Sequence, residues 1–330
     1  MSQSLTIGLV YDLRENYVPT TEQPKDFYAE FDSQKTVSEL SKMIAELGYN
    51  VIEIGDVHSL ARHIYVEKTN LDLVFNIAEG LYGRARESQV PALLEANEIP
   101  HTGSDALTLA LTLDKAVTKR IWLSEGLPTV PFLVVDDANN LQPDDVGLPS
   151  FPLFSKPLYA GSSIGIDNDA LSTTYQELYE RIKKLTTRYK QPVLVEAFLP
   201  GKEYTVCVFE NQGEVTVLGI TEILSYTPNK FSVFEEKEAW NPDFFAEVSD
   251  LRLYNRLSEL AVKAFKSVGC RDIGRVDIRF DEADSPNLIE INPLPILKKP
   301  STIAWIAEKQ GYDLMYIIRK IINNAIYRNS

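Results

Sequence analysis

The fold is decided by residues 274–292, which read Gly-Arg-Val-Asp-Ile-Arg-Phe, then Asp-Glu-Ala-Asp-Ser-Pro-Asn, then Leu-Ile-Glu-Ile-Asn. Apolar and polar residues alternate in the first and last of these segments, as they do in strands with one buried face. The middle segment, residues 281–287, is rich in chain-reversing residues. The stretch therefore predicts a β-hairpin. On its second strand the period of two places Leu288 on one face with Glu290 and Asn292, and the two isoleucines on the other.

The polar face of this hairpin carries oxygen donors. Asp277, Glu290 and Asn292 come within reach of one another there, with no histidine or cysteine among them. Three hard oxygen ligands suit Mg²⁺, which completes its shell with water and substrate phosphates. The alternative is an amphipathic hairpin with a solvated polar face.

Composition narrows the class of protein. The chain has 330 residues, of which 44% are hydrophobic and 24% charged, and this length predicts two or three globular domains. A net charge of −14 argues against a nucleic-acid partner, because nucleic-acid binding needs a basic surface. No apolar stretch approaches the ~20 residues of a spanning helix, so no membrane partner is expected.

The two cysteines, Cys207 and Cys270, form no metal-binding or redox motif. Cys207 lies in an apolar strand pattern, which predicts a buried thiol with a structural role. Together with the lack of a secretory signal pattern at the N-terminus, this cysteine usage predicts a cytoplasmic protein.

The first hundred residues alternate between strand and helix patterns. Short apolar runs at residues 6–11 and 71–75 predict buried strands. Between them a helix capped by Asp32 or Ser33 ends at Gly48. A further strand and a further helix follow the same alternation, which predicts a parallel α/β layer.

Residues 105–125 form one long helical pattern that contains two lysines. Lys115 and Lys119 lie one helical turn apart and so share a face. The alternative for both is a solvated lysine on a surface helix.

A strand pattern then ends at Lys156 and leads into Gly-Ser-Ser-Ile-Gly, residues 161–165, here called the Gly-Ser loop. Small residues let backbone amides approach an anion, and Ser162 and Ser163 add hydroxyl donors, so the loop predicts a phosphate site. The same residues match a hydrolase nucleophile elbow, but that site needs a later histidine, and all three histidines precede Ser163. An ordinary Gly-Ser turn is the remaining alternative.

Residues 193–203 predict a buried strand that breaks at Pro-Gly and carries two isolated carboxylates. Glu196 interrupts an apolar run and so needs a donor, which a purine amine beside the backbone of Ala197 and Leu199 would supply. Glu203 is suited to ribose hydroxyls. A surface glutamate at a strand edge is the alternative for either residue.

The order of these motifs, with Glu-x-Asn-x-x-Pro last, resembles the ATP-grasp fold and, more closely, the D-alanine-D-alanine ligase family. The likeness covers residues 71–303 well and the first seventy weakly. It implies an α/β fold of three domains, a parallel-sheet domain at 1–103 and two domains that clasp ATP at 104–195 and 196–330.

The resemblance also implies binding residues for ATP and for two Mg²⁺ ions, with Mn²⁺ as an accepted substitute. The residues implied for ATP are Lys115, Lys156, Gly161, Ser162, Ser163, Glu196, Ala197, Phe198, Leu199, Glu203 and Lys237. The residues implied for the metal are Asp277, Glu290 and Asn292.

The activity implied is ligation of a carboxylate to an amine of amino-acid or peptide substrates, through an acyl phosphate and with ADP as a product. Catalytic roles would fall to Arg275, Lys237 and Ser163, and substrate contacts to Glu30, Glu79 and Ser301. Residues 225–241 are expected to form a lid that excludes water. A homodimer is a further expectation.

Several positions depart from the family pattern, and all of them touch the amino-acid pocket. Glu79 stands where a histidine is usual, and Ile296 stands where a glycine is usual. Arg84 and Arg86 either receive a second carboxylate or pair with Glu79 and Glu87. D-alanine is therefore expected to be a poor substrate. The alternatives are a true D-alanine-D-alanine ligase, a phosphotransferase, and a nucleotide-binding protein without turnover.

Overall fold

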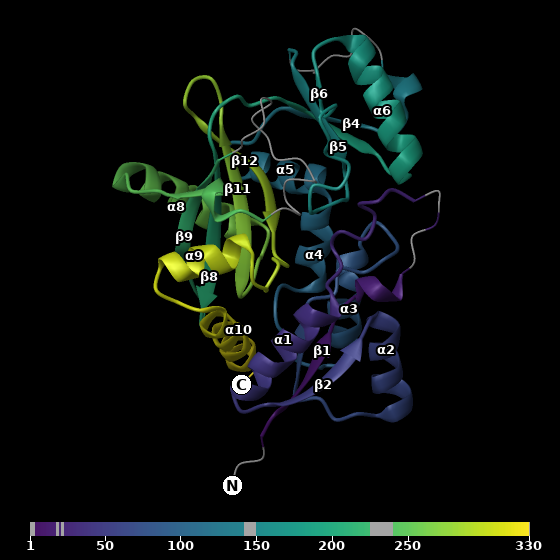
Figure 1. Cartoon of the computed structure of the whole chain (residues 1–330), viewed down its shortest axis with the longest axis vertical. Helices are drawn as coiled ribbons and strands as arrows, with labels where there is room; N and C mark the ends of the chain where they lie inside the picture. The colour runs from purple at the N-terminus through teal and green to yellow at the C-terminus, as the bar shows by residue number, and fades with distance from the viewer. Residues whose placement is uncertain (1–3, 18–19, 21–22, 142–149, 225–239, 330) are drawn as a thin grey trace.

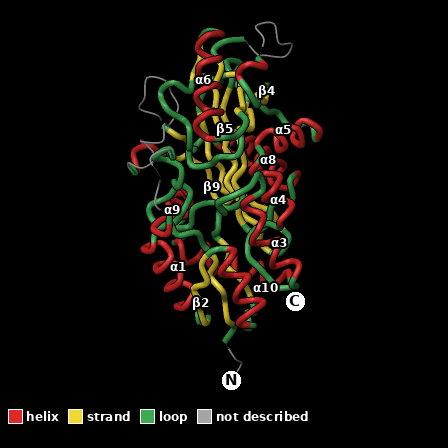
Figure 2. Tube along the Cα trace, turned by 90° about the vertical axis from the view of Figure 1, so that its right-hand side faces the viewer, coloured by secondary structure: helices red, strands yellow, loops and turns green. Residues whose placement is uncertain are grey.

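The computed structural model describes residues 4–17, 20, 23–141, 150–224 and 240–329. These residues form three sheets that follow one another along the chain (Figure 1). The N-terminal sheet lies at one end of the elongated molecule and the sheet that carries α6 at the other, with the largest sheet beside the middle (Figure 2).

The N-terminal sheet has three strands in the order β2-β1-β3. All of them pair in parallel, as the sequence predicts. Its elements are β1 (Thr6–Val10), α1 (Gln34–Glu46), β2 (Asn50–Gly55), α2 (Val57–Arg62), β3 (Leu73–Asn76) and α3 (Gln89–Ala96). One face packs against α1, and the other packs against α2 and α3. The predicted cap of α1 is confirmed, because the Ser33 hydroxyl accepts a hydrogen bond from the Thr36 amide at 3.3 Å.

The second sheet is antiparallel and has the order β4-β7-β5-β6, with α6 packed against one face. Its elements are β4 (Phe132–Val135), β5 (Leu153–Pro157), β6 (Leu171–Ser172), α6 (Tyr175–Tyr189) and β7 (Val193–Ala197). Because β7 is an interior strand, Glu196 lies in the middle of the sheet and is 3% exposed. The alternative of a surface glutamate at a strand edge is therefore wrong for this residue.

The third sheet is antiparallel, with the order β10-β9-β8-β11-β12, and it packs between α8 and α9. Its elements are β8 (Glu203–Asn211), β9 (Glu214–Ile223), β10 (Phe245–Glu247), α8 (Leu251–Ser267), β11 (Ile273–Phe280), β12 (Pro286–Asn292) and α9 (Thr302–Lys309). Strands β11 and β12 form the predicted hairpin, with Asp277 opposite Glu290. Cys207 is fully buried on β8, as predicted.

One side-chain direction on β12 differs from the prediction. Glu290 pairs with Asp277, but the next pair is Leu288 with Ile278, so Ile289 is an extra residue on this strand. Such a β-bulge shifts the alternation of faces by one residue. Leu288 is consequently buried in the core with Ile291, and Ile289 lines a cavity beside Glu290.

The predicted single helix at residues 105–125 is wrong, because the structure has two helices there, α4 (Ala106–Leu113) and α5 (Lys115–Ser124). Asp114 breaks the pattern with an extended ψ of 93°, and its carboxylate accepts hydrogen bonds from the amides of Ala116 and Val117. Asp114 is thus the N-cap of α5. The break places Lys115 in the first turn of a helix.

The last helix, α10 (Leu314–Arg328), returns to the N-terminal domain. Its apolar face joins the core formed by α1 and the parallel sheet, and it also contacts β8 (Figure 1). Arg328, its last residue, pairs with the fully buried Asp272 that precedes β11. Short 3₁₀ segments lie at Arg14–Asn16, Arg86–Ser88, Ala138–Asn140 and Pro242–Phe244, and a π turn lies at His63–Glu67.

Candidate active site

A cavity of about 110 Å³ lies between the two antiparallel sheets. Strand β5, the Gly-Ser loop, β7, β11 and β12 all contribute side chains to it. It brings together most of the residues that the sequence implies for ATP and metal: Lys115, Lys156, Gly161, Ser163, Glu196, Ala197, Phe198, Leu199, Glu203, Asp277 and Glu290. Ser162 lines a neighbouring cavity instead.

Two lysines hold the buried carboxylate of Glu196. The Nζ atom of Lys119 lies 2.7 Å from one carboxylate oxygen, and that of Lys156 lies 3.0 Å from the other. Burial opposes ionisation of Glu196, but the charges of these two lysines outweigh it and lower the pKa of Glu196. Lys119 is 0% exposed, so the alternative of a solvated helix lysine is wrong. Its pKa is lowered by burial and by the nearby charge of Lys156.

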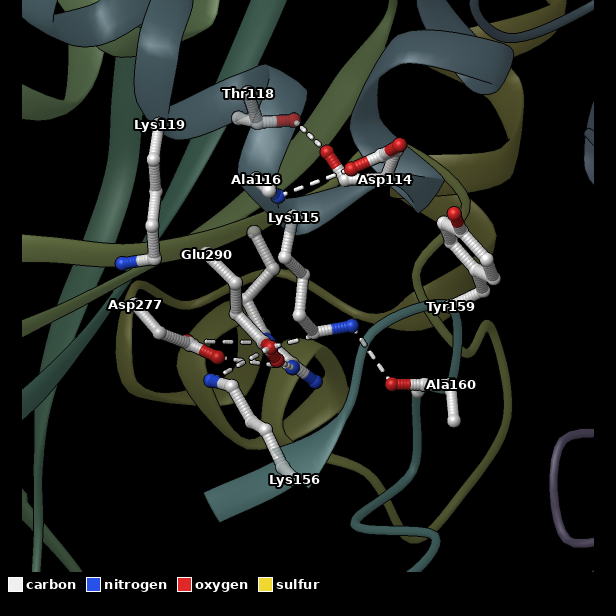
Figure 3. Close-up of polar contacts among 12 residues, drawn as sticks. Asp114, Lys115, Ala116, Thr118, Lys119, Lys156, Tyr159, Ala160, Asp277 and Glu290 are labelled. Atoms are coloured by element: carbon white, nitrogen blue, oxygen red, sulfur yellow. Dashed lines mark hydrogen bonds and ion pairs between the residues drawn. The ribbon is translucent and has the colours of Figure 1, made fainter. Parts of the chain in front are cut away.

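Lys115 and Lys156 converge on Glu290 (Figure 3). Their Nζ atoms lie 3.8 Å and 4.0 Å from the same Glu290 oxygen, and Lys115 also donates to the carbonyl of Ala160 at 2.7 Å. Burial lowers the pKa of Lys115. The pKa of Lys156 is raised, because the charges of Glu196 and Glu290 outweigh its burial. The site thus holds two cations close to one partly exposed carboxylate.

The hairpin places a guanidinium between its two carboxylates. Arg275 lies 2.9 Å from Asp277 and 3.4 Å from Glu290, and Thr205 donates to the other oxygen of Asp277 at 2.8 Å. Asn292 pairs with Arg275 across the strands, and its side-chain oxygen accepts from the Leu294 amide at 2.9 Å. Asp277 and Glu290 are hard oxygen donors on adjacent strands, which fits the Mg²⁺ site that the sequence predicts.

Glu203 and Arg279 form a further ion pair at the rim of the same cavity. The two side chains lie 3.0 Å apart, and the Arg279 guanidinium lies over the Phe198 ring, 5.1 Å from its centroid. Arg279 was not among the predicted site residues. The alternation along β11 places it on the same face as Asp277, which was the one available signal.

The Gly-Ser loop is held by carboxylates of the N-terminal domain. The Gly161 amide donates to Glu30 at 2.6 Å, and the Gly165 amide donates to Asp26 at 2.8 Å. Tyr189 also donates to the Asp26 oxygen, at 2.8 Å. Ser162 and Ser163 have φ of 47° and 58°, in the left-handed region. The amides at the two ends of the loop are therefore already bonded to carboxylates.

Glu30, Glu79 and Glu87 form a carboxylate cluster whose oxygens lie within 4.8 Å of one another. Arg86 neutralises part of this charge, since it lies 2.6 Å from Glu30 and 3.8 Å from Glu87. Burial raises the pKa of Glu87 to about 7, and burial with the neighbouring carboxylates raises that of Glu79. Both oxygens of Glu30 already accept hydrogen bonds, so a substrate ammonium would be its third partner.

The two arginines of this region have different partners. Arg86 joins the carboxylate cluster, which agrees with the alternative that it pairs with nearby glutamates. It also donates to the Tyr159 carbonyl at 2.7 Å. Arg84 pairs instead with Asp114, at 2.5 Å. Its predicted pairing with Glu79 or Glu87 is therefore wrong, because the loop directs it toward the N-cap of α5.

A second cavity, of about 570 Å³, shares Glu203 and Asp277 with the first. Ser301 lines it and is also the N-cap of α9, where its hydroxyl accepts from the Ala304 amide at 3.2 Å. A contact of Ser301 with a substrate carboxylate stays a prediction. Lys237 and residues 225–239 of the expected lid lie outside the described residues.

The comparison with protein families finds one match over most of the chain. Residues 121–323 match the family described as "D-ala D-ala ligase C-terminus". Among the described residues, no helix is long and apolar enough to cross a membrane.

Two relatives match over most of this chain. A D-alanine-D-alanine ligase from Carboxydothermus hydrogenoformans is 31% identical over 300 residues, which cover 88% of this chain and 92% of that protein. An uncharacterized protein, y4sG, from Sinorhizobium fredii is also 31% identical, over 77% of this chain and 74% of its own.

The fold has solved counterparts. The crystal structure of a D-alanine-D-alanine ligase from Bacillus anthracis, complexed with ATP, superposes with a TM-score of 0.74 and covers 99% of both chains at 20% identity. A second structure of the ligase from that organism gives a TM-score of 0.75. This likeness confirms the fold that the sequence predicts.

Proposed function

The chain belongs to the D-alanine-D-alanine ligase family and has its ATP-grasp fold, and from this premise we propose that it joins the carboxylate of one amino acid to the amine of another while ATP is converted to ADP. The observation that carries the proposal is the convergence of Lys115 and Lys156 on Glu290, next to Asp277 and Arg275. Phosphoryl transfer requires cations that stabilise the charge on the phosphate and oxygen ligands that hold the metal, and this partly buried site has both.

In the first step a substrate carboxylate oxygen attacks the terminal phosphorus of ATP. The bond from that phosphorus to the bridging oxygen breaks, ADP leaves, and an acyl phosphate forms. Lys115 and Lys156 would contact the phosphates, because their ammonium groups lie 3.8 Å and 4.0 Å from Glu290, one of the two carboxylates proposed for the metal. Binding of the phosphates would give Lys156 a further anionic partner besides Glu196 and Glu290.

Asp277 and Glu290, with Asn292 beside them, would hold Mg²⁺. Bound there, the metal would draw negative charge from the phosphate oxygens. Thr205 orients Asp277 through its hydrogen bond to one carboxylate oxygen, and Arg275 donates to both oxygens.

In the second step the amine of the acceptor attacks the acyl carbon. A tetrahedral oxyanion forms and collapses, the phosphate leaves, the ammonium proton is released, and an amide bond remains. Arg275 lines the second cavity, contacts Asp277, which lines both cavities, and would stabilise that oxyanion. Its ion pairs with Asp277 and Glu290 hold it in place for this role.

The nucleotide cavity is smaller than ATP requires. Its volume of about 110 Å³ is well below the ~300 Å³ at which ligand pockets begin. The two clasping sheets would therefore separate to admit the nucleotide, with Glu196 and the backbone of β7 on the adenine and Glu203 on the ribose.

The proposal is tested by incubating the full-length enzyme with Mg²⁺-ATP and pooled L- and D-amino acids. We expect release of ADP and phosphate that depends on the amino acids, and a dipeptide identified by mass spectrometry. ADP with a phosphorylated amino acid and no dipeptide would indicate a phosphotransferase. No ADP from any pool would leave a binding protein without turnover.

The proposal also covers the domain boundaries, the oligomeric state and the cellular location of the protein. The units proposed are residues 1–103, 104–195 and 196–330, with the chain as a homodimer. A cytoplasmic location is supported by the two cysteines, Cys207 and Cys270, which are both unpaired.

A further inference from the structure

The second cavity opens from the reacting centre. It shares Glu203 and Asp277 with the nucleotide cavity, and Arg275 also lines it. A substrate held there would reach the acyl carbon next to Arg275. This cavity is therefore the place for the amino acid that attacks the acyl phosphate.

Its wall is apolar and aromatic. Trp240 and Phe245 stack with their ring centroids 4.9 Å apart, and the Phe245 ring lies 5.6 Å from that of Trp305 on α9. Ile296 also faces the cavity and is 37% exposed, although it is a large hydrophobic side chain. An apolar wall of this kind favours a ligand that covers it.

Two cationic side chains line the part of this cavity that lies away from the shared carboxylates. Arg14 and Lys298 line it and do not line the nucleotide cavity. Arg14 is the more exposed of the two, but it donates to the Ala29 carbonyl at 3.1 Å. Lys298 has 31% of its side chain exposed and a distant pairing of 3.7 Å to Asp32. An accessible ammonium at the edge of an apolar pocket suits the carboxylate of an amino acid.

The size of the cavity distinguishes among acceptors. A volume of about 570 Å³ falls in the ~300–1,000 Å³ range of pockets that hold drug-sized ligands. Alanine offers one methyl group and would leave the aromatic wall in contact with water. We propose that the acceptor is an amino acid with a large apolar side chain, which packs against Trp240 and Phe245 while its carboxylate pairs with Lys298.

This inference rests on the proposed function, because it names the acceptor class for the same reaction. The test uses the full-length enzyme with Mg²⁺-ATP and every donor-acceptor pair from glycine, alanine, leucine and phenylalanine, in both chiralities. Phosphate release gives the rate, and mass spectrometry identifies the C-terminal residue of the dipeptide. We expect kcat/KM for a leucine or phenylalanine acceptor to exceed that for alanine by at least about 10-fold.

The outcomes separate the two proposals. An alanine acceptor that is used as well as leucine or phenylalanine overturns the inference and leaves the ligase proposal standing. No dipeptide from any pair overturns both.

Two variants test the wall and the cation separately. Phe245→Ala should reduce the preference for the large acceptor over alanine by about 10-fold. Lys298→Gln should raise KM for the acceptor by about 10-fold with kcat little changed, because it removes a charge that binds ground state and transition state alike. The matched control is Lys299→Gln, whose side chain pairs with Glu308 and does not line the cavity. Equal effects of the two lysine variants would overturn the carboxylate assignment.

Discussion

The backbone amide of Gly161 donates a 2.6 Å hydrogen bond to the side chain of Glu30, 131 residues earlier in the chain. Arg86 holds the other oxygen of Glu30 at 2.6 Å, so the carboxylate is fixed on both sides. Asp26 binds the Gly165 amide in the same way. The N-terminal domain thus sets the position of both ends of the Gly-Ser loop.

Glu30→Gln should raise KM for ATP by about 10-fold, since the uncharged amide weakens both the loop anchor and the pair with Arg86. Steady-state kinetics with ATP as the varied substrate would measure the change. Glu39→Gln on the exposed side of α1 is the control. An unchanged KM would mean that the loop keeps its position without Glu30.

Glu290→Gln should leave the protein folded but lower Mg²⁺-dependent turnover by at least about 100-fold, because one of two anionic metal ligands is lost. ADP release would be followed across a Mg²⁺ titration, with a thermal melt to verify folding. Turnover within about twofold of the unsubstituted enzyme would defeat the metal assignment.

Lys156→Ala should weaken ATP binding by about 10- to 100-fold, because a charge-assisted contact with phosphate is lost from a desolvated site. Glu196 keeps Lys119 as its partner, so the fold should persist. Isothermal calorimetry measures the affinity. Lys184→Ala, which removes a surface lysine paired with Asp167 and Asp169, should bind ATP normally. Unchanged affinity in the first variant would make the Gly-Ser loop an ordinary turn.

Glu87 should make stability depend on pH. Its pKa is raised by burial to about 7 from its ordinary value of 4.5, so between these pH values the folded chain keeps a proton that the unfolded chain has lost. Stability is therefore greatest below pH 4.5 for this group and falls as pH rises to about 7.

Glu87→Gln removes that titration, and the free energy of unfolding near pH 8 should rise relative to its value near pH 5 by more than about 1 kcal/mol compared with the parent. Urea unfolding at both pH values would show it. Glu46→Gln on the surface of α1 should not change the difference. Parallel pH profiles for parent and Glu87→Gln would count against the raised pKa.

Arg328→Met should cost about 3–5 kcal/mol, because it leaves Asp272 buried without its cation. Chemical denaturation gives this number. Arg319 lies on the exposed side of the same helix, so Arg319→Met should leave the free energy of unfolding nearly unchanged. A small effect at Arg328 would mean that the Gly103 amide, which donates to Asp272 at 2.6 Å, is a sufficient partner.

The parts of the fold that the sequence predicts correctly depend on local signals. The Ser33 cap, the alternation of β11 and the parallel pairing of the first strands each follow from residues close in sequence. The two errors arise where one residue breaks a period. An extra Ile289 shifts the faces of β12, and Asp114 begins a new helix inside an apparently continuous pattern.

The same distinction between local and long-range signals applies to the candidate site. Lys156, Glu196 and Asp277 are identifiable from sequence because each is a charged residue within or at the end of a predicted strand. Their pairings join different elements, so periodicity cannot reveal them. The sequence does not identify Asp26, because it lies in a polar loop and binds a backbone amide. Every residue except proline has such an amide, so the type of the partner residue gives no signal.

The position of α10 also has a consequence for how the chain is made. The N-terminal domain needs Ile317, Ile318 and Ile321 to complete the core against α1 and the parallel sheet. A ribosome adding ~5–20 residues per second needs tens of seconds to travel from β3 to that helix. Throughout this interval the nascent N-terminal domain exposes an apolar face, which makes it a client for chaperones. A chain that stops short of residue 314 would expose the same face permanently.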